Sequence, residues 1–437
     1  MNQNRRVVVT GMGAVTPLGN NVADTWNGLR TGKNGIDHIT LFDTEKFKAK
    51  LAAEVRRFDP GQYLEVNDVL RTDRYTQFAV ASAQQAVDES GIAGKVDPDR
   101  FSVLFGTGIG GINTFETEHT KLLEKGPRRV SPLFIPMMIS NMAAGMIAIR
   151  HDCRGTAMPI VTACASGSNA IGEAMRLIRH GYADAVITGG TEAAVTPSAV
   201  AGFVNMQALS TSDDPNAASL PFDSRRGGFV IGEGGGALVI ETESHALARG
   251  AEIYAELAGW ANNNDAHHVT DPDPEGRKAA QCIASSIRRA GLTPADVDHI
   301  NAHGTGTKLG DSAEMAAIGA VFGKRNGCPD GEMTDPDTGQ RGEPYSCKTP
   351  SSAGPTISST KGATGHIMGG GGLTESIACI KAINTGVVPP TLNLEDPEGD
   401  FDFVAGESRR QQVKVAINTA FGFGGQNASL VFRRYEG

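Results

Sequence analysis

Cys164 has the surroundings that best suit covalent chemistry in this chain. It follows a short apolar run that ends near Val161, and a helix-forming stretch, 165–179, comes directly after it. A thiol at the N-terminus of a helix meets the positive end of the helix dipole, which favours the nucleophilic thiolate. The neighbouring residues are small, so a thioester could approach the sulfur. On this segment alone, a small buried cysteine at a strand–helix junction fits equally well.

Two histidines and a phenylalanine stand in similar settings. His303, His366 and Phe423 each follow a β-branched run and are flanked by glycine and other small residues. Ligands of α/β proteins bind at the carboxyl ends of strands, so these side chains are expected to meet Cys164. A cysteine beside two imidazoles could form and cleave a thioester. A single loop histidine is more often a surface residue, but two in such settings favour a reactive site.

The segments between these residues alternate between short β-branched runs and helical patterns. Such alternation is typical of an α/β protein with largely parallel sheets. The predicted strands are Arg6–Val9, Ser102–Phe105, Pro159–Thr162, Ala185–Thr188, Gly236–Glu241, Ile253–Ala258, His299–Asn301, Thr356–Ser358 and Val413–Asn418. The predicted helices are Asp24–Arg30, Asp73–Glu89, Ala165–Arg179, Gly276–Ala290, Asp311–Phe322 and Leu373–Thr385.

The length of the chain predicts two halves. A chain of 437 residues exceeds one ordinary core, so we expect units at 1–250 and 251–437. Residues 323–355 interrupt the second unit with a Gly, Pro, Asp and Ser rich stretch. We expect it to be a surface excursion or a partner-binding element. It contains Cys328 and Cys347, for which two free thiols are a simpler account than a disulfide or a shared metal.

Composition narrows the function further. The net charge of −9 argues against nucleic acid as a main partner. No apolar run approaches the roughly 20 residues that span a bilayer, and the short run after the first arginines is not a signal peptide. We therefore expect a cytoplasmic protein that makes no membrane contact. The six cysteines have no regular spacing, which disfavours a disulfide framework.

Taken together and in order, these motifs resemble the β-ketoacyl-acyl-carrier-protein synthases, the elongating condensing enzymes, and are most similar to the type II branch. The resemblance runs nearly end to end. It rests on Val7–Gly13, the Cys164 segment, His303–Thr307, Lys361–His366 and Phe421–Gly425. It implies the thiolase-like fold, in which two duplicated α/β halves form a five-layer α-β-α-β-α sandwich. It also implies a homodimer, acyl carrier protein as partner, no cofactor and no metal.

The resemblance also implies a reaction and roles for the residues that carry it. The enzyme would be an acyltransferase that joins an acyl group to malonyl-carrier protein with loss of carbon dioxide, in fatty-acid elongation. Cys164 would carry the acyl group, and the amides of Cys164 and Phe423 would bind the oxyanion. His303 and His366 would stabilise the malonyl enolate. Lys361 would orient the site with Glu314 as its candidate partner, unless these two only form a buried ion pair that supports the fold.

Further positions match the family's substrate-binding residues. Thr305 and Thr307 would bind the pantetheine arm, and Phe423 would act as a gate. Ile109 and Phe134 would line the acyl pocket, with Phe134 supplied by the second subunit. Turn formation and ordinary core packing are the plainer readings of these residues. The run 106–111 matches G-x-G-x-x-G, but the acidic residue of a dinucleotide site is not evident about 20 positions later.

The chain also departs from the family. Ser212 and Leu220 stand where basic residues often dock the carrier protein, and Gln426 replaces a common threonine. Docking is then expected on other arginines, namely Arg71, Arg74, Arg128, Arg129, Arg225 or Arg226. A non-catalytic chain-length-factor-like subunit would lack the cysteine. A thiolase or a priming synthase would lack one of the histidines. A polyketide ketosynthase shares all three residues and stays an alternative.

Overall fold

The computed structural model describes residues 5–323 and 354–437, so Cys328, Cys347 and nearly all of the expected 323–355 excursion lie outside the described residues. Ten strands form one continuous sheet in the order β10-β9-β13-β14-β8-β1-β7-β6-β4-β5. They are β1 (Val7–Val15), β4 (Phe101–Gly106), β5 (Ala157–Ile160), β6 (Ala185–Glu192), β7 (Gly234–Thr242), β8 (Ala255–Asn264), β9 (His299–Asn301), β10 (Thr356–Ser358), β13 (Val415–Gly422) and β14 (Gln426–Arg433). Two separate two-stranded sheets are formed by β2 (Asp37–His38) with β3 (Leu51–Ala52) and by β11 (Val387–Val388) with β12 (Arg409–Arg410).

This sheet consists of two units with the same topology. In the first unit β5, β4 and β6 are parallel to one another. β7 then pairs antiparallel with β6, and β1 pairs antiparallel with β7. The second unit repeats this arrangement with β10, β9 and β13 parallel and with β14 and β8 antiparallel. Only Val8 and Val9 of β1 pair with β8, so the sheets of the two units join along a narrow seam. The sheets are therefore mixed rather than largely parallel.

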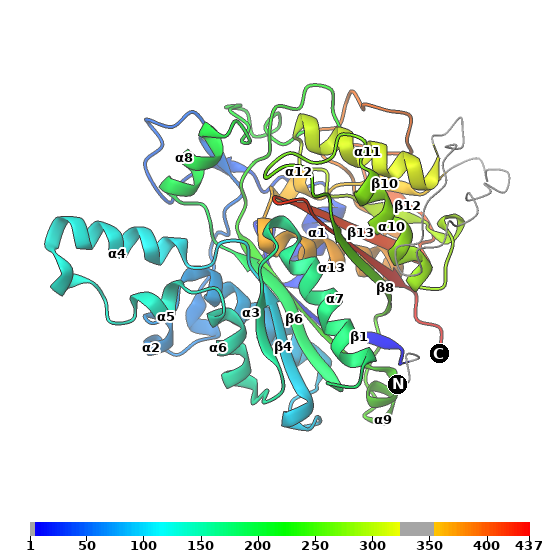
Figure 1. The fold of residues 1–437 in the computed structure, drawn as a ribbon, viewed down its shortest axis with the longest axis horizontal. Coiled ribbons are helices and arrows are strands. Elements are labelled where there is room, and N and C mark those ends of the chain that lie inside the picture. Colours follow the sequence, from blue (N-terminus) through cyan, green and yellow to red (C-terminus); the bar gives the residue numbers. More distant parts are fainter. Residues whose placement is uncertain (1–4, 324–353) are drawn as a thin grey trace.

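Helices separate and cover the two units, which gives the five layers (Figure 1). The helices are α1 (Val22–Arg30), α2 (Val66–Val69), α3 (Arg74–Ser90), α4 (Ile112–Lys125), α5 (Phe134–Met138), α6 (Met142–His151), α7 (Ser166–Arg179), α8 (Pro197–Asn205), α9 (Glu243–Ala248), α10 (Arg277–Arg289), α11 (Lys308–Phe322), α12 (Lys361–Thr364) and α13 (Gly371–Thr385). α3 and α10 cover the outer faces, while α7 and α13 pack on each other and contact both sheets.

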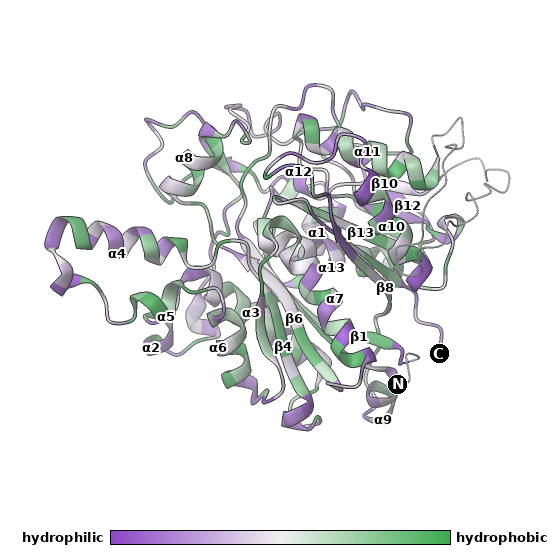
Figure 2. Ribbon diagram, in the orientation of Figure 1, coloured by the Kyte–Doolittle hydropathy of each residue, from purple (hydrophilic) through white to green (hydrophobic). Residues whose placement is uncertain are grey.

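The sequence explains why the middle layer can be so tightly packed. α7 and α13 carry mostly small or aliphatic residues on their buried faces. A Cβ on Gly372 of α13 would lie 2.2 Å from the Ser168 hydroxyl of α7, so the two helices approach at a distance that only glycine permits. Figure 2 shows the apolar residues concentrated along the central strands, and polar residues on the outer loops. The reactive segments lie where this layer meets the strand ends.

Several elements were not expected from the sequence, among them β14, α4 and α5. β14 has the polar start Gln426-Asn427, which hides its alternation, and it forms because Gly424 and Gly425 adopt positive φ and turn the chain back along β13. α4 and α5 project from the body as an arm (Figure 1), and only Thr114 and Glu118 of α4 are buried. Such a poorly buried helix leaves a weak apolar signal.

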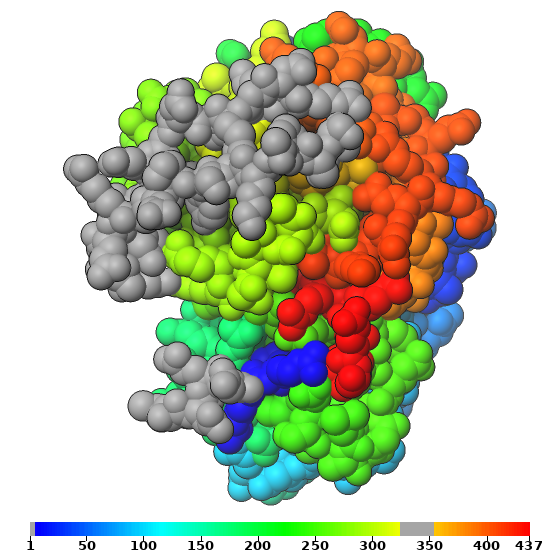
Figure 3. Space-filling view, turned by 90° about the vertical axis from the view of Figure 1, so that its right-hand side faces the viewer, coloured from blue at the N-terminus to red at the C-terminus, as the bar shows by residue number. Residues whose placement is uncertain are grey.

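The two chain ends meet at the seam between the units. In the space-filling view, the last residues lie beside the first described ones (Figure 3). The Arg6 guanidinium lies 5.1 Å from the centre of the Tyr435 ring, and the Tyr435 hydroxyl donates to Glu243. No helix in the described ranges 5–323 and 354–437 is long and apolar enough to cross a bilayer.

Candidate active site

Cys164 is presented by a strained turn between β5 and α7. Ala163 has a φ of 50°, a left-handed conformation that is rare for a residue with a side chain. Cys164 lies in the 3₁₀ turn η4 (Ala163–Ala165), which runs directly into α7. A Cβ on Gly422 would lie 3.0 Å from the Cys164 amide nitrogen, so only glycine lets the end of β13 approach this turn. The thiol therefore sits where both units meet.

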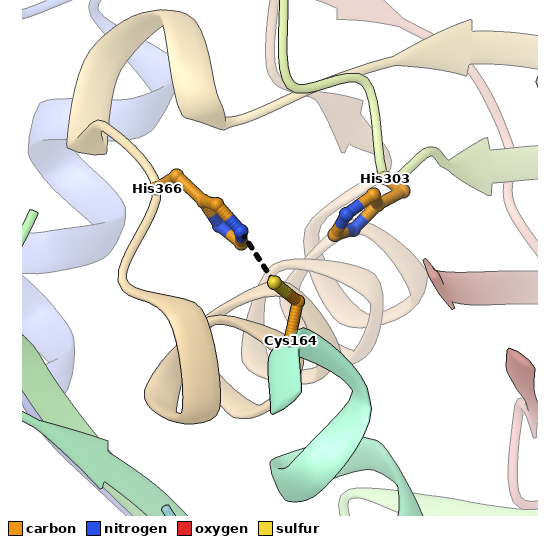
Figure 4. Close-up of side chains that lie close together, drawn as sticks. All are labelled: Cys164, His303 and His366. Atoms are coloured by element: carbon orange, nitrogen blue, oxygen red, sulfur yellow. Dashed lines mark hydrogen bonds between the residues drawn. The ribbon is translucent and has the colours of Figure 1, made fainter. Parts of the chain in front are cut away.

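The structure brings both predicted histidines to this thiol. The Nε2 atom of His366 lies 3.0 Å from the Cys164 sulfur, and the His303 ring is perpendicular to the His366 ring with centroids 5.3 Å apart (Figure 4). His366 follows β10 and His303 follows β9. Burial and the nearby Lys361 charge hold the pKa of both imidazoles well below the usual 6.5. Both rings are therefore neutral near pH 7.

His303 is fixed through its backbone by Glu314. Both carboxylate oxygens of this α11 residue accept hydrogen bonds, at 2.8 Å from the His303 N–H and 2.7 Å from the Gly304 N–H. The Thr419 hydroxyl donates to the same carboxylate at 2.8 Å. Burial raises the pKa of Glu314 to about 7. Glu314 thus shapes the loop that carries His303.

The expected pairing of Lys361 with Glu314 is wrong. The Lys361 ammonium bonds to Glu375 of α13, and both side chains are buried. Glu375 lies 14 residues after Lys361, a spacing that no local pattern singles out. Glu314 faces the His303 loop instead, because α11 starts just after that loop. The charge of Lys361 still reaches the site, since it lowers the pKa of Cys164 and of both histidines.

The thiol itself rests in the protonated form, contrary to the expected thiolate. Burial raises the pKa of Cys164 to about 12. The Lys361 charge and the backbone N–H groups of Phe423 and Cys164 act in the opposite direction. These two amides therefore face the sulfur, which is the geometry of a hole for an oxyanion formed next to it. If the thiol acts as a nucleophile, a base must remove its proton, and His366 Nε2 is the nitrogen in contact with it.

The same three residues are spaced closely enough to share a metal ion. Their ligand atoms lie within 4.8 Å of one another. A dication bound there would be repelled by Lys361, whose charge acts on all three groups. The donor set therefore fits proton transfer better than metal binding.

These groups open into a cavity of about 520 Å³. Its lining includes the three clustered residues, the pantetheine candidates Thr305 and Thr307, the acyl-pocket candidate Ile109, and Phe423. The hydroxyls of Thr305 and Thr307 lie 3.0 Å apart, and the buried Asp311 holds the N–H groups of Thr305 and Gly306. Phe423 stands at the tip of the β13–β14 hairpin, beside the positive-φ residues Gly424 and Gly425. Its ring lies 6.4 Å from that of Phe203.

Phe134 does not line this cavity within its own chain. It starts α5 on the projecting arm, where its ring lies 6.3 Å from Phe115. The glycine-rich run 106–111 is part of the cavity wall, because Gly108 and Ile109 line it. The backbone N–H groups of these two residues donate to the Glu192 carboxylate. Sequence reasoning missed Glu192, since an acidic residue at the end of a strand carries no distinctive pattern.

Three of the arginines considered for docking are engaged within the fold. Arg74 pairs with Glu233 at 2.6 Å, and Arg225 pairs with Asp223 at 2.7 Å. Arg226 is only 3% exposed and donates to the carbonyls of Thr307 and Lys308. Arg226 is therefore too buried to meet a carrier protein, whereas the docking role of Arg74 and Arg225 stays a prediction. Arg71, Arg128 and Arg129 are exposed, as is Arg225.

Comparison with known proteins agrees with this geometry. Residues 4–246 match the model of the beta-ketoacyl synthase N-terminal domain, and 254–331 with 345–395 match that of the C-terminal domain. Proteins named 3-oxoacyl-[acyl-carrier-protein] synthase 2 from Synechocystis sp. and Coxiella burnetii are 46% and 44% identical, over 99% of both chains in each case. The same name is carried by a Staphylococcus aureus protein that is 43% identical over the whole of both chains.

Solved structures show the same likeness. A beta-ketoacyl synthase from Burkholderia phymatum superposes with a TM-score of 0.86 at 31% identity, covering 99% of this chain and all of the other. A type II polyketide ketosynthase, solved in complex with its acyl-carrier protein, gives the same TM-score, identity and coverage. The fold is the thiolase-like fold of these ketosynthases. With the cysteine and the two histidines meeting at the junction of its two units, this chain belongs to the beta-ketoacyl synthase family.

Proposed function

We propose that this protein is a 3-oxoacyl-acyl-carrier-protein synthase of type 2. It would condense an acyl-carrier protein with malonyl-carrier protein to give the 3-oxoacyl product, carbon dioxide and free carrier protein. The observation that carries the proposal is the contact between the Cys164 sulfur and His366 Nε2, with His303 beside them, in one cavity. The relatives at 43–46% identity bear the corresponding name.

The first step is transfer of the acyl group to Cys164. As the sulfur attacks the thioester carbonyl, its proton passes to His366 Nε2, because the thiol is neutral and this nitrogen lies 3.0 Å away. The amides of Cys164 and Phe423 stabilise the tetrahedral oxyanion. When the intermediate collapses, His366 returns the proton to the departing carrier-protein thiol. The products are the acyl-cysteine and free carrier protein, and both imidazoles end neutral.

The second step is decarboxylation and carbon–carbon bond formation. Because His366 Nε2 ends the first step without a proton, the ring first moves its proton from Nδ1 to Nε2 by exchange with water. His303 and His366 then donate hydrogen bonds from Nε2 to the malonyl thioester oxygen, which stabilises the enolate as carbon dioxide leaves. The Nδ1 atoms of both rings are buried without a partner in the described part of the chain, so no protein group fixes either tautomer. The enolate carbon attacks the acyl-Cys164 carbonyl. Cys164 leaves as a thiolate and regains a proton from solvent.

The remaining predicted residues would place the substrates. Thr305 and Thr307 line the cavity with hydroxyls suited to the amide groups of a pantetheine arm. Ile109 gives an apolar wall for the acyl chain, and Phe423 would swing on its glycine hinge to admit it. The exposed pair Arg128–Arg129 would meet the acidic carrier protein, with Arg71 as a further contact.

Two alternative functions can be distinguished from the proposed one by specific observations. A non-catalytic chain-length-factor-like subunit would have no use for the contact between Cys164 and His366. A polyketide ketosynthase shares the fold, but the ketosynthase neighbours of that class are 31–32% identical, against 43–46% for the type 2 synthases.

Purified protein, acyl-carrier protein and malonyl-carrier protein should release carbon dioxide and yield a product longer by two carbons. Absence of this product with every acyl chain length supplied would overturn the proposal.

We also propose that the protein is a homodimer. β5 ends the sheet and leaves an open edge. Exposed apolar side chains lie on the arm, on β5 or just after it, and on α6. They are Phe115, Leu122, Leu123 and Ile135 on the arm, Met158 and Val161 at and after β5, and Ile149 on α6. A second copy would cover this surface and bring its Phe134 to the acyl pocket. Light scattering should then give twice the chain mass of 45.7 kDa, and a stable monomer at micromolar concentration would contradict the dimer.

The lowered pKa values of the histidines predict how decarboxylation depends on pH. The pKa of each imidazole lies well below 6.5, so each ring stays neutral until the pH falls to its lowered pKa. Malonyl decarboxylation by a Cys164→Ala variant should therefore show no acid limb between pH 8 and pH 6.5. The double variant Lys361→Met/Glu375→Gln removes the buried charge pair, so the pKa of both imidazoles rises and the acid limb moves up. An acid limb centred at pH 6.5 in the Cys164→Ala variant alone would contradict this.

A further inference from the structure

Glu192 is a buried carboxylate with no cation beside it. It ends β6, is 0% exposed, and forms no ion pair within the described residues. Four donors share its two oxygens. The Thr107 hydroxyl and the Ile109 N–H donate to Oε1 at 3.0 and 3.2 Å, and the Gly108 and Gly369 N–H groups donate to Oε2 at 2.6 and 3.2 Å. A carboxylate offers about four lone pairs, so all of its acceptor capacity is used.

These four bonds connect loops from opposite units of the protein. Residues 107–109 follow β4 of the first unit, whereas Gly369 lies in the 3₁₀ turn η6 (Met368–Gly370) between His366 and α13 of the second. The loops touch backbone to backbone, because a Cβ on Gly369 would lie 2.4 Å from the Gly108 nitrogen. Met368 has a φ of 43°, a strained conformation that persists only where neighbouring bonds hold it. The bond from Gly369 to Glu192 is one of these.

The residues held in this way form a wall of the reaction cavity. Gly108, Ile109 and Met368 line the cavity together with Cys164, whereas Glu192 lies behind the wall and does not line it. Ile109 is partly exposed to the cavity and Met368 is buried. The apolar surface that an acyl chain on Cys164 would meet is therefore positioned from behind by one carboxylate.

Resting on the proposed function, we propose that Glu192 is a positioning residue that sets the acyl-chain selectivity of the enzyme. Glu192 holds the backbone of Ile109 and of Gly369, the residue after Met368. It thereby fixes the positions of the Ile109 and Met368 side chains, which form the wall along which a long acyl chain must pack. A short acyl chain makes few contacts with this wall and depends on it little. Malonyl decarboxylation takes place at the histidines and needs no acyl chain, so it is insensitive to the wall.

The Glu192→Gln variant tests this proposal. One amide oxygen cannot accept four bonds, and the amide nitrogen would face N–H groups that need an acceptor. The ratio of kcat/KM for dodecanoyl- to butyryl-carrier protein should fall about tenfold. Decarboxylation, measured in a Cys164→Ala background, should stay within about twofold. An unchanged ratio in a folded variant of an active enzyme would overturn the inference, whereas an inactive wild type would overturn the proposed function instead.

A matched control and a milder variant separate positioning from stability. Asp73 is another buried carboxylate, 3% exposed, which accepts from the Thr114 N–H and hydroxyl and does not line the cavity. Asp73→Asn should lower the melting temperature and leave the selectivity ratio unchanged. Thr107→Val removes one of the four donors to Glu192 at nearly constant volume. It should shift the ratio in the same direction by a smaller factor, and this variant decides the matter if Glu192→Gln does not fold.

Discussion

Cys164→Ala is expected to abolish condensation while malonyl decarboxylation continues. The alanine cannot form the acyl thioester, so the rate of product formation should fall by at least about 10⁴-fold. In the proposed mechanism the enolate, by contrast, is stabilised by the two imidazoles, which line the cavity after β9 and β10 and do not depend on the thiol. Release of carbon dioxide from malonyl-carrier protein should therefore persist although no 3-oxoacyl product forms. This release does not need the proton transfer from the Cys164 sulfur to His366.

The two products are measured separately, by labelled carbon dioxide and by mass spectrometry of the carrier protein. Cys153→Ala is the matched control, because Cys153 is a buried free cysteine that does not line the cavity. It should retain condensation at the wild-type rate once its stability has been checked. Condensation near the wild-type rate in Cys164→Ala would remove the covalent intermediate from the mechanism.

Alanine substitutions of the two histidines are expected to separate the two half-reactions. His303→Ala removes one enolate donor, so decarboxylation should fall by about 10² to 10³-fold. Acyl transfer to Cys164 should continue, because the proton of the thiol passes to His366. His366→Ala removes both the proton acceptor and an enolate donor, so both half-reactions should fall.

The half-reactions are followed by mass spectrometry of the acyl-enzyme and by carbon dioxide release. Near-ultraviolet circular dichroism shows whether each variant keeps its native packing. Loss of acyl transfer in a natively folded His303→Ala enzyme would mean that His303, rather than His366, handles the thiol proton. Equal losses of both half-reactions in the two variants would mean that the imidazoles act as one unit.

The reactive residues could be predicted from the sequence because each stands at a strand end among small residues. Cys164, His303 and His366 are local signals of this kind, and the family order of the motifs placed them in one site. The strands and helices that carry them were also predicted, within a few residues at their ends. β-Branched runs and apolar periodicity are properties of short segments, so a single sequence contains them.

The contacts between distant segments could not be predicted in this way. Lys361 pairs with Glu375 and Glu314 holds the His303 loop, and both arrangements depend on how α11, α12 and α13 pack. The resting protonation of Cys164 depends on burial, which only the assembled cavity shows. The mixed sheet depends on where β7 and β14 return, and those turns are set by long-range packing and by two glycines.

The repeated topology of the two units shows that the clustered side chains come from corresponding positions in different units. β5 and α7 in the first unit correspond to β10 and α13 in the second, so Cys164 and His366 occupy equivalent positions. At this position the first unit presents a thiol, and the second unit presents an imidazole. Neither unit holds a complete reaction centre, so a chain cut near the seam would regain activity only when both fragments reassemble.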